Sequence, residues 1–342
     1  MNSHELIQDI RTIVKYKKAK HDIDSFLKRH NCDILCLDKE VYLEKYEKNR
    51  KIIIERFLAS KEFIEGLKVP YALFKGAVLS KQLYKDPFAR NSGDIDLLFC
   101  IDNYSEIKNA LTQAGFVQGR FINGKIEPVS RRQRIFQTSM THQIPSFVKV
   151  INHHEDMCIT IDLNHNLMWG ENKEKLETSR VLKYVEDDEI CGVKYKKLIP
   201  EMDFIAICLH HYKDMNSFFQ LIKGHYRLKL FWEIYKYLIE VQPDTKKLNE
   251  LCGILSVGAY VYYCIYYVQI IFEDSRLEEY LSSLCVYRED GIMDTYGLNE
   301  EERKKWGMPF EERLISEVLP LYVYNNLTEK EKENINKNIK YM

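Results

Sequence analysis

Features that would direct the chain out of the cytoplasm or onto a polyanion are scarce in this sequence. The nine cysteines include no CxxC pair and no Cys/His cluster at zinc spacing, which argues against a disulfide framework or a structural zinc site. The 50 basic and 51 acidic side chains give a formal net charge of -1, so no global field would draw the protein to nucleic acid. The first residues lack the apolar core of a signal peptide, and we therefore expect a cytoplasmic protein.

Long uncharged runs are also rare. Residues 251–272 carry no formal charge and are about long enough to cross a bilayer. This run contains glycines, a glutamine and five tyrosines, which would make a poor lipid-facing surface. We expect one buried helix here and no membrane partner.

The order of apolar and polar residues predicts an α+β protein. The composition, 45% hydrophobic and 30% charged, is that of a folded body rather than a disordered chain. Helical spacing predicts an N-terminal helical region over 1–68 and a helical domain over 199–342. Between them, residues 69–198 alternate short β-type runs with helices, which predicts a small mixed sheet of four or five strands. The expected strands are 71–75, 94–100, 147–152 and 158–167, the last two forming an antiparallel hairpin.

Two acidic residues stand one position apart at the start of a predicted strand. Successive side chains of a strand point to opposite faces, so Asp94 and Asp96 share one face while Ile95 and Leu97 bury the other. Two carboxylates so close repel each other unless a cation neutralises them, and a hard, oxygen-seeking ion such as magnesium does so. This pair predicts a metal site.

A third carboxylate, Asp162, lies within an otherwise apolar strand, where an unpaired charge would be expensive. If that strand lies beside the strand of Asp94 and Asp96, three carboxylates meet at one edge of the sheet. Such an arrangement holds two magnesium ions that clamp the attacking and leaving oxygens of a phosphoryl displacement. We therefore predict Asp94, Asp96 and Asp162 as both metal ligands and catalytic residues.

The turn after the first strand fits the same chemistry. A strand followed by Gly76 and a helix presents backbone amides to phosphate oxygens with no side chain in the way. Lys75 and Arg90 would flank the pocket and balance the charge of a triphosphate, although each could equally be a surface cation. Ser92 and Gly93, directly before the acidic pair, are predicted nucleotide contacts as well.

These motifs resemble the nucleotidyltransferase superfamily typified by DNA polymerase beta, with its glycine turn, helix, Asp-x-Asp strand and later Asp. Within it, Lys75-Gly76-Ala77, the Gly-Asp-Ile-Asp-Leu-Leu run from Gly93 and the later Leu-His-His-Tyr-Lys with Arg227-Leu228-Lys229 look like the bacterial family of uncharacterised nucleotidyltransferases. The resemblance spans roughly residues 50 to 240. It implies transfer of a nucleoside monophosphate from a triphosphate, with ATP the expected donor.

Two positions depart from the family pattern. Ala77 stands where the superfamily usually has Ser or a second Gly, so one hydroxyl contact to phosphate is missing. Two residues beyond the third Asp, relatives are expected to have His, whereas this chain has Asn164, followed by His165 on the opposite face of a regular strand. We therefore assign a role to neither of them.

Other basic residues could either bind a ligand or simply lie on a solvated surface. Lys213 and Arg227, on predicted helices, could contact nucleotide or acceptor, or could simply belong to a solvated helix face. The run 131–134 could hold phosphate, but we expect a solvated loop. The leading expectation for the acceptor is a small molecule or peptide product. A toxin-like enzyme acting on tRNA or protein and a non-catalytic nucleotide-binding module remain alternatives.

Overall fold

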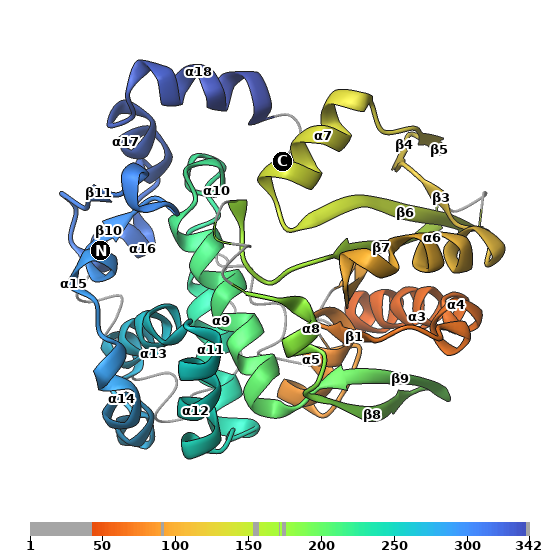
Figure 1. Cartoon of the computed structure of the whole chain (residues 1–342), viewed down its shortest axis with the longest axis horizontal. Coiled ribbons are helices and arrows are strands. Elements are labelled where there is room, and N and C mark those ends of the chain that lie inside the picture. The colour runs from red at the N-terminus through yellow and green to blue at the C-terminus, as the bar shows by residue number, and fades with distance from the viewer. Residues whose placement is uncertain (1–42, 90–91, 153–156, 171, 173–175, 340–342) are drawn as a thin grey trace. The chain divides into compact units, whose positions relative to one another are not determined.

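The chain forms two units, which are described separately. In the computed structural model, the described residues are 43–89, 92–152, 157–170, 172 and 176–339. Contacts separate residues Tyr42–Asp203 from a unit that contains Phe204–Met342. Figure 1 labels the elements of both units. The helices expected before residue 43, the predicted contact Arg90 and the expected turn at 153–156 lie outside the described residues.

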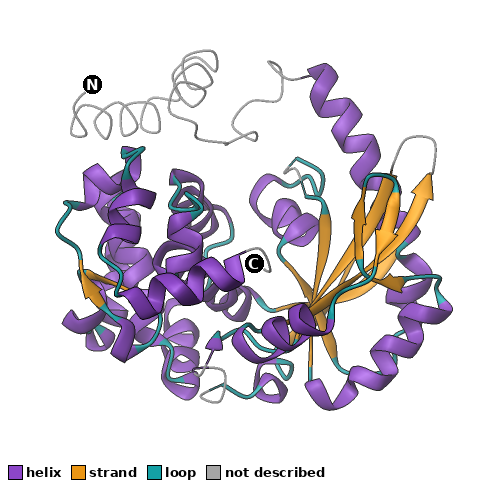
Figure 2. Cartoon of the chain, turned by 90° about the horizontal axis from the view of Figure 1, so that it is seen from above, coloured by secondary structure: helices purple, strands orange, loops and turns teal. Residues whose placement is uncertain are grey.

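The first unit is built on a mixed seven-stranded sheet, which confirms the α+β class (Figure 2). The strand order is β3-β6-β7-β2-β1-β9-β8; β2 with β7 and β1 with β9 run parallel, and the other neighbours run antiparallel. The predicted hairpin of β6 and β7 is confirmed. The strands are β1 (Tyr71–Phe74), β2 (Asp94–Phe99), β3 (Val117–Gln118), β6 (Gln143–Asn152), β7 (Met157–Asn164), β8 (Val185–Ile190) and β9 (Val193–Leu198). A separate two-stranded sheet pairs β4 (Arg120–Ile122) with β5 (Lys125–Glu127).

The prediction of four or five strands was wrong: it missed the two-residue strand β3 and also β8 and β9, which are dominated by charges. Their apolar positions are sparse, yet the two strands pair in register with opposite charges facing each other. Lys197 contacts Glu186 at 2.9 Å and Lys196 contacts Asp187 at 2.7 Å. The connecting residues, Cys191 and Gly192, both have positive φ, as a tight hairpin turn requires. Charge pairing across the strands therefore replaces the apolar alternation that reveals the other strands.

Helices pack against one face of the sheet, which is apolar, and the polar side chains of β2 and β7 lie on the opposite face. Ile95, Leu97 and Phe99 of β2 are buried, as are Ile159, Ile161 and Leu163 of β7, in one cluster with side chains from the flanking helices. The intervening residues of both strands point to the other side. Around the sheet lie α3 (Leu43–Ala59), α4 (Lys61–Gly66), α5 (Gly76–Tyr84), α6 (Tyr104–Gln113), α7 (Arg131–Met140) and α8 (Thr178–Val181) (Figure 1).

The basic run 131–134 is helical, so the expectation of a solvated loop was wrong. The side chain of Ser130 accepts a hydrogen bond from the backbone N–H of Gln133 and caps the helix α7. Arg131, Arg132 and Arg134 are exposed in its first turn. Arginine and glutamine are themselves good helix formers, and the N-cap serine fixes where the helix begins.

The second unit is helical, and its apolar segment 251–272 is divided. The expected single helix is two, because Ser256 takes a left-handed conformation with φ of 55° and ends the first of them. Both halves bury apolar side chains. Among the described residues, no helix combines the length and the hydrophobicity that a membrane-spanning segment needs. The main helices are α9 (Pro200–Asn216), α10 (Phe218–Ile222), α11 (Leu228–Glu240), α12 (Thr245–Leu255), α13 (Gly258–Phe272), α14 (Glu278–Leu284), α15 (Asp290–Met293), α16 (Phe310–Ile315), α17 (Leu319–Asn325) and α18 (Glu329–Asn338), with a two-stranded β10 (Thr295–Tyr296) and β11 (Lys304–Lys305).

Candidate active site

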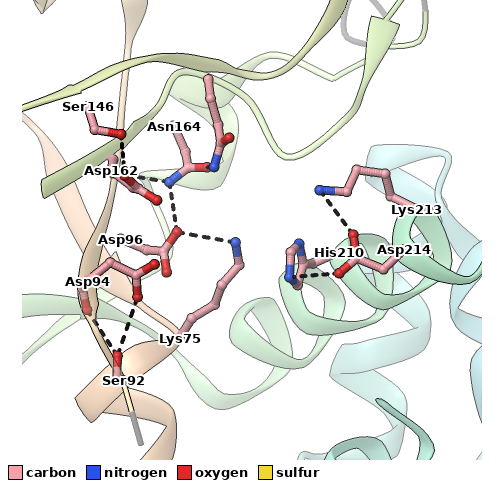
Figure 3. Close-up of polar contacts among 11 residues, drawn as sticks. Lys75, Ser92, Asp94, Asp96, Ser146, Asp162, Asn164, His210, Lys213 and Asp214 are labelled. Carbon is pink, nitrogen blue, oxygen red and sulfur yellow. Dashed lines mark hydrogen bonds and ion pairs between the residues drawn. The ribbon is translucent and has the colours of Figure 1, made fainter. Parts of the chain in front are cut away.

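The register of two parallel strands gathers three carboxylates on the polar face of the sheet. Asp96 of β2 lies directly across from Asp162 of β7, and Asp94 lies across from Thr160. Residues that face each other on neighbouring strands point to the same side, so Asp162 stands beside Asp96 with Asp94 following on the same face. Figure 3 shows the three side chains grouped in this way. The expected neighbourhood of the two strands is confirmed.

Asp96 is the buried member of the group, at 7% exposure. Its Oδ1 oxygen accepts a hydrogen bond from the Lys75 ammonium at 3.3 Å and another from the Asn164 amide nitrogen at 3.2 Å. A buried carboxylate is tolerated only with such partners, because leaving it unpaired would cost several kcal/mol. Lys75 is therefore a buried counter-ion rather than a surface cation.

Asp162 is held in an environment that disfavours its charge. Its Oδ1 accepts a hydrogen bond from the Ser146 hydroxyl at 2.6 Å. Burial, and then the neighbouring charges of Asp96 and Asp94, raise the pKa of Asp162 to about 7, against the smaller opposing effects of Ser146 and Lys75. The positive charge of Lys75 alone therefore does not neutralise the three carboxylates.

The turn between β1 and α5 packs tightly against the start of β2. Lys75 and Gly76 both have positive φ, 56° and 43°. A Cβ on Gly76 would lie 3.0 Å from the Ser92 hydroxyl and 3.3 Å from the Asp94 carbonyl, so only glycine fits without strain. Ser92 in turn donates to the Asp94 carbonyl at 3.0 Å and lies 3.4 Å from its Oδ1. The glycine turn and the acidic strand are thus one compact structure.

Asn164 belongs to this network, although we assigned it no role from the sequence. Its side chain is fully buried, and its amide nitrogen donates both to Asp96 Oδ1 and to the backbone carbonyl of Asp162, each at 3.2 Å. Gln143 of β6 donates to the Asn164 Oδ1 at 3.2 Å and so fixes the orientation of the amide. The signal for Asn164 was its position two residues after Asp162, on the same face. Ser146 and Gln143 gave no signal, because they depend on the register of β6.

Two predicted contacts lie in the second unit. Lys213 of α9 lies 3.3 Å from the Asp214 carboxylate, which also has His210 at 3.5 Å (Figure 3). Arg227 donates from Nε to the carbonyl of Gly224 at 3.2 Å. A role for Lys213 or Arg227 in nucleotide or acceptor binding stays a prediction.

The donor set fits magnesium in its chemistry, but the side chains are turned toward protein partners. Among the described residues, no three His, Cys, Asp or Glu side chains stand arranged as a group that could hold a metal ion. Asp96 and Asp162 instead direct oxygens at Lys75, Asn164 and Ser146. Three carboxylates on one face, with an ammonium group already drawn to them, are nevertheless hard oxygen ligands in need of a cation. Binding of a divalent ion would require these side chains to exchange partners.

Comparison with known protein families gives a match over most of the chain. The profile of a family described as "Uncharacterised nucleotidyltransferase" matches residues 46–273, which include all three carboxylates and the glycine turn. No curated protein and no solved structure matches the chain.

Proposed function

The chain belongs to the family of uncharacterised nucleotidyltransferases, and on this premise we propose that it transfers a nucleoside monophosphate group from a nucleoside triphosphate to an acceptor hydroxyl or phosphate, releasing pyrophosphate. The observation that carries the proposal is the pairing of Asp162 with Asp96 across two parallel strands, with Asp94 on the same face. A raised pKa for Asp162 supports it, because a site built to attract cations leaves its acids crowded in their absence.

Asp94, Asp96 and Asp162 are the residues that would hold two magnesium ions. When bound, these ions supply positive charge to the triphosphate oxygens and to the attacking and leaving oxygens. The acceptor oxygen then forms a bond to the α-phosphorus while the bond to the pyrophosphate oxygen breaks. Asp162 receives the proton that leaves an acceptor hydroxyl, and the departing electron pair stays on pyrophosphate.

The other residues of the site position these acids and the phosphates. Lys75 holds Asp96 before the cation arrives and can then turn its ammonium group to a phosphate oxygen. Gly76 packs against Ser92 and Asp94 at the start of β2, and we place the phosphate oxygens beside the backbone amides of Gly76, Ser92 and Gly93. Asn164 keeps Asp96 oriented through the exchange of partners.

We propose a small molecule or a peptide product as acceptor, with ATP as the expected donor. The net charge of -1 gives no support to tRNA as acceptor, although a local basic surface could serve one. Presence of all three carboxylates argues against a module that only binds nucleotide.

The test is label transfer. Protein, magnesium and each α-labelled nucleoside triphosphate are incubated with cell extract, and pyrophosphate release and labelled products are measured. Asp94→Asn and Asp96→Asn should abolish both signals, whereas Asp102→Asn, an equal change of charge at an exposed residue of the same unit, should preserve them. If wild type and the two active-site variants behave alike with every triphosphate, the proposed function is wrong.

A further inference from the structure

A basic surface covers α7 and the ribbon formed by β4 and β5, outside the group of carboxylates. Residues 117–142 include five basic residues and one acidic residue, Glu127, whereas the whole chain has a formal net charge of -1. All five basic side chains are exposed: Arg120, Lys125, Arg131, Arg132 and Arg134. The segment therefore carries a local excess of four positive charges, which the composition of the whole chain conceals.

The pairing of β4 with β5 gathers the exposed residues of the ribbon on one face. Arg120 lies across from Glu127, and Ile122 lies across from Lys125. Directly paired residues point to the same side, and residues two positions apart on a strand share a face. These four side chains are exposed, whereas the residues between them on both strands are partly buried. Cations and an aliphatic side chain thus stand together on one open face.

Arg120 connects this face to the first turn of α7. Its Nε and Nη2 atoms donate to the amide oxygen of Gln133 at 2.9 and 2.8 Å. On the helix, Arg134 and Ile135 lie three and four residues after Arg131, so these side chains share one exposed face. The helix and the ribbon both pack on β6, as Figure 1 shows. The basic surface is therefore continuous from the ribbon to the helix.

The cations of this surface differ from other surface charges of the same unit. On β8 and β9, opposite charges pair across the strands, as Lys197 does with Glu186 at 2.9 Å. In the described part of the chain, no ion pair holds Arg131 or Arg134. Contact with water alone would account for these charges. It would not account for the apolar side chains beside them.

Exposed aliphatic side chains are concentrated in the same segment. Among the described residues, nine large apolar side chains are exposed, and three of them lie here: Val117, Ile122 at 40% and Ile135 at 57% exposure. Exposed apolar side chains together with arginine are typical of protein interfaces. Single-stranded RNA, by contrast, stacks its bases on aromatic rings, and none of the three is aromatic. The surface therefore matches an acidic peptide with aliphatic side chains better than it matches RNA.

The helix connects this surface to the candidate active site. Thr141 ends α7, since its hydroxyl donates to the Gln137 carbonyl at 2.6 Å and accepts from the backbone N–H of Gln143 at 3.1 Å. Gln143 donates to Asn164, which orients Asp96. Ten helical residues rise about 15 Å, so the first turn lies about that far along the helix from the end that joins β6. An acceptor that reaches both must be an extended chain rather than a small molecule.

We propose that α7 and the β4–β5 ribbon bind the acceptor, a peptide that carries acidic and aliphatic side chains. This inference rests on the proposed function and deepens it by naming the chemical class of the acceptor. The carboxylates of the peptide contact the exposed arginines, and its aliphatic side chains cover Ile122 and Ile135. About five extended residues span the length of α7. A peptide held on the surface thus reaches β6 and brings its reacting hydroxyl to the carboxylates.

The test selects peptides from a random-sequence library displayed on phage and compares their binding to purified variants. Sequences enriched on wild type should be rich in Asp, Glu, Leu and Ile. A synthetic peptide of an enriched sequence should bind Arg131→Glu/Arg134→Glu about tenfold more weakly, because two attractions become repulsions. Ile135→Ser should weaken binding by about threefold through lost apolar contact. Arg180→Glu/Lys183→Glu, an equal change of charge at exposed residues of the same unit, should bind as wild type.

Three results overturn the inference. The first is that no acidic sequence is enriched. The second is that the synthetic peptide binds Arg131→Glu/Arg134→Glu as tightly as wild type. The third is that labelled random-sequence RNA binds wild type more tightly than the peptide and loses this binding in the same variant, because the surface then takes RNA. Should the charge reversal not fold, Arg131→Gln/Arg134→Gln takes its place.

Nucleotide transfer separates this inference from the proposed function. If wild type transfers label from a triphosphate to cell extract but enriches no acidic peptide, only the acceptor surface is wrong. If an enriched peptide binds but no triphosphate gives transfer to any acceptor, the proposed function and the acceptor role are wrong, and only peptide binding stands.

Discussion

The crowding of acids at the site makes the metal-free protein less stable than it could be, and Asp162→Asn should reveal this. Burial, together with Asp96 and Asp94, raises the pKa of Asp162 from 3.8 to about 7 in the folded protein. The unfolded chain keeps the ordinary value. Between these two values the folded state binds more protons than the unfolded state, so the free energy of unfolding falls as the pH rises from about 4 to about 7.

The size of the effect follows from the shift. A difference of about three pKa units corresponds to about 4 kcal/mol, because each unit is about 1.4 kcal/mol. Since Asp162 shares its titration with neighbouring carboxylates, we expect roughly 2–4 kcal/mol. Asp162→Asn keeps the shape of the side chain and can still accept from Ser146 while removing the charge. It should therefore match wild type near pH 4 and exceed it by roughly 2–4 kcal/mol at pH 8.

This difference is measured by urea unfolding in the presence of a chelator, at a series of pH values from about 4 to about 8. Asp102→Asn, at an exposed position, serves as the control and should follow wild type at every pH. The same Asp162→Asn variant should lose nucleotide transfer, so that stability rises as activity falls. Parallel stability curves for wild type and Asp162→Asn, or a less stable Asp162→Asn at pH 8, would show that the charge of Asp162 does not destabilise the folded protein.

Three further changes test other parts of the structure. Gly76→Ala, at a φ of 43° and with its new Cβ 3.0 Å from a hydroxyl, should lower the free energy of unfolding by about 1–3 kcal/mol, whereas Gly66→Ala, with open space around it, should not; urea titration compares them. Asn164→Ala should reduce the rate of transfer by about ten- to a hundredfold while thermal unfolding shows an intact fold, and an unchanged rate would exclude its positioning role. Arg313→Ala removes a buried side chain whose guanidinium lies 4.7 Å from the centre of the Trp306 ring. It should lower the free energy of unfolding, measured by urea titration, by about 2–4 kcal/mol. A stability equal to wild type would show that this contact is unimportant.

The strands that carry the site were predictable because their residues alternate. The run around Asp94 and Asp96 places apolar side chains on one face and acids on the other, and the structure keeps this division. The pairing of Asp162 with Asp96 was a conditional prediction, since alternation says which face a residue occupies but not which strand lies beside it. The structure supplies that register.

The site residues that could not be predicted from the sequence reach the site through contacts between distant segments. Gln143 and Ser146 reach the site only because β6 pairs with β7. Neither of these residues stands in a motif. Lys75 was named as a phosphate contact, but its partner in the structure is Asp96, a contact that requires both strands to be placed.

The predicted boundaries of two helical segments were wrong, and in each case the cause is local. One residue, Ser256, divides the apolar run 251–272, and nothing in the hydrophobic pattern marks it as left-handed. Conversely, the basic run after Ser130 was interpreted as a solvated loop from its charge, although Arg and Gln favour helices and Ser130 caps one. The backbone conformation or capping interaction of a single residue thus decides where a helix begins or ends. Hydrophobicity averaged over many residues does not reveal such positions.

Asp94, Asp96 and Asp162 are expected to form one metal site. Titration of manganese, a spectroscopically visible substitute for magnesium, followed by electron paramagnetic resonance in the presence of tripolyphosphate, tests it directly. Wild type and Asp102→Asn should bind the ion tightly, and Asp94→Asn, Asp96→Asn and Asp162→Asn should each weaken its binding. Manganese binding that is unchanged in Asp162→Asn would contradict the claim, because the carboxylate across the strand would then take no part in the site.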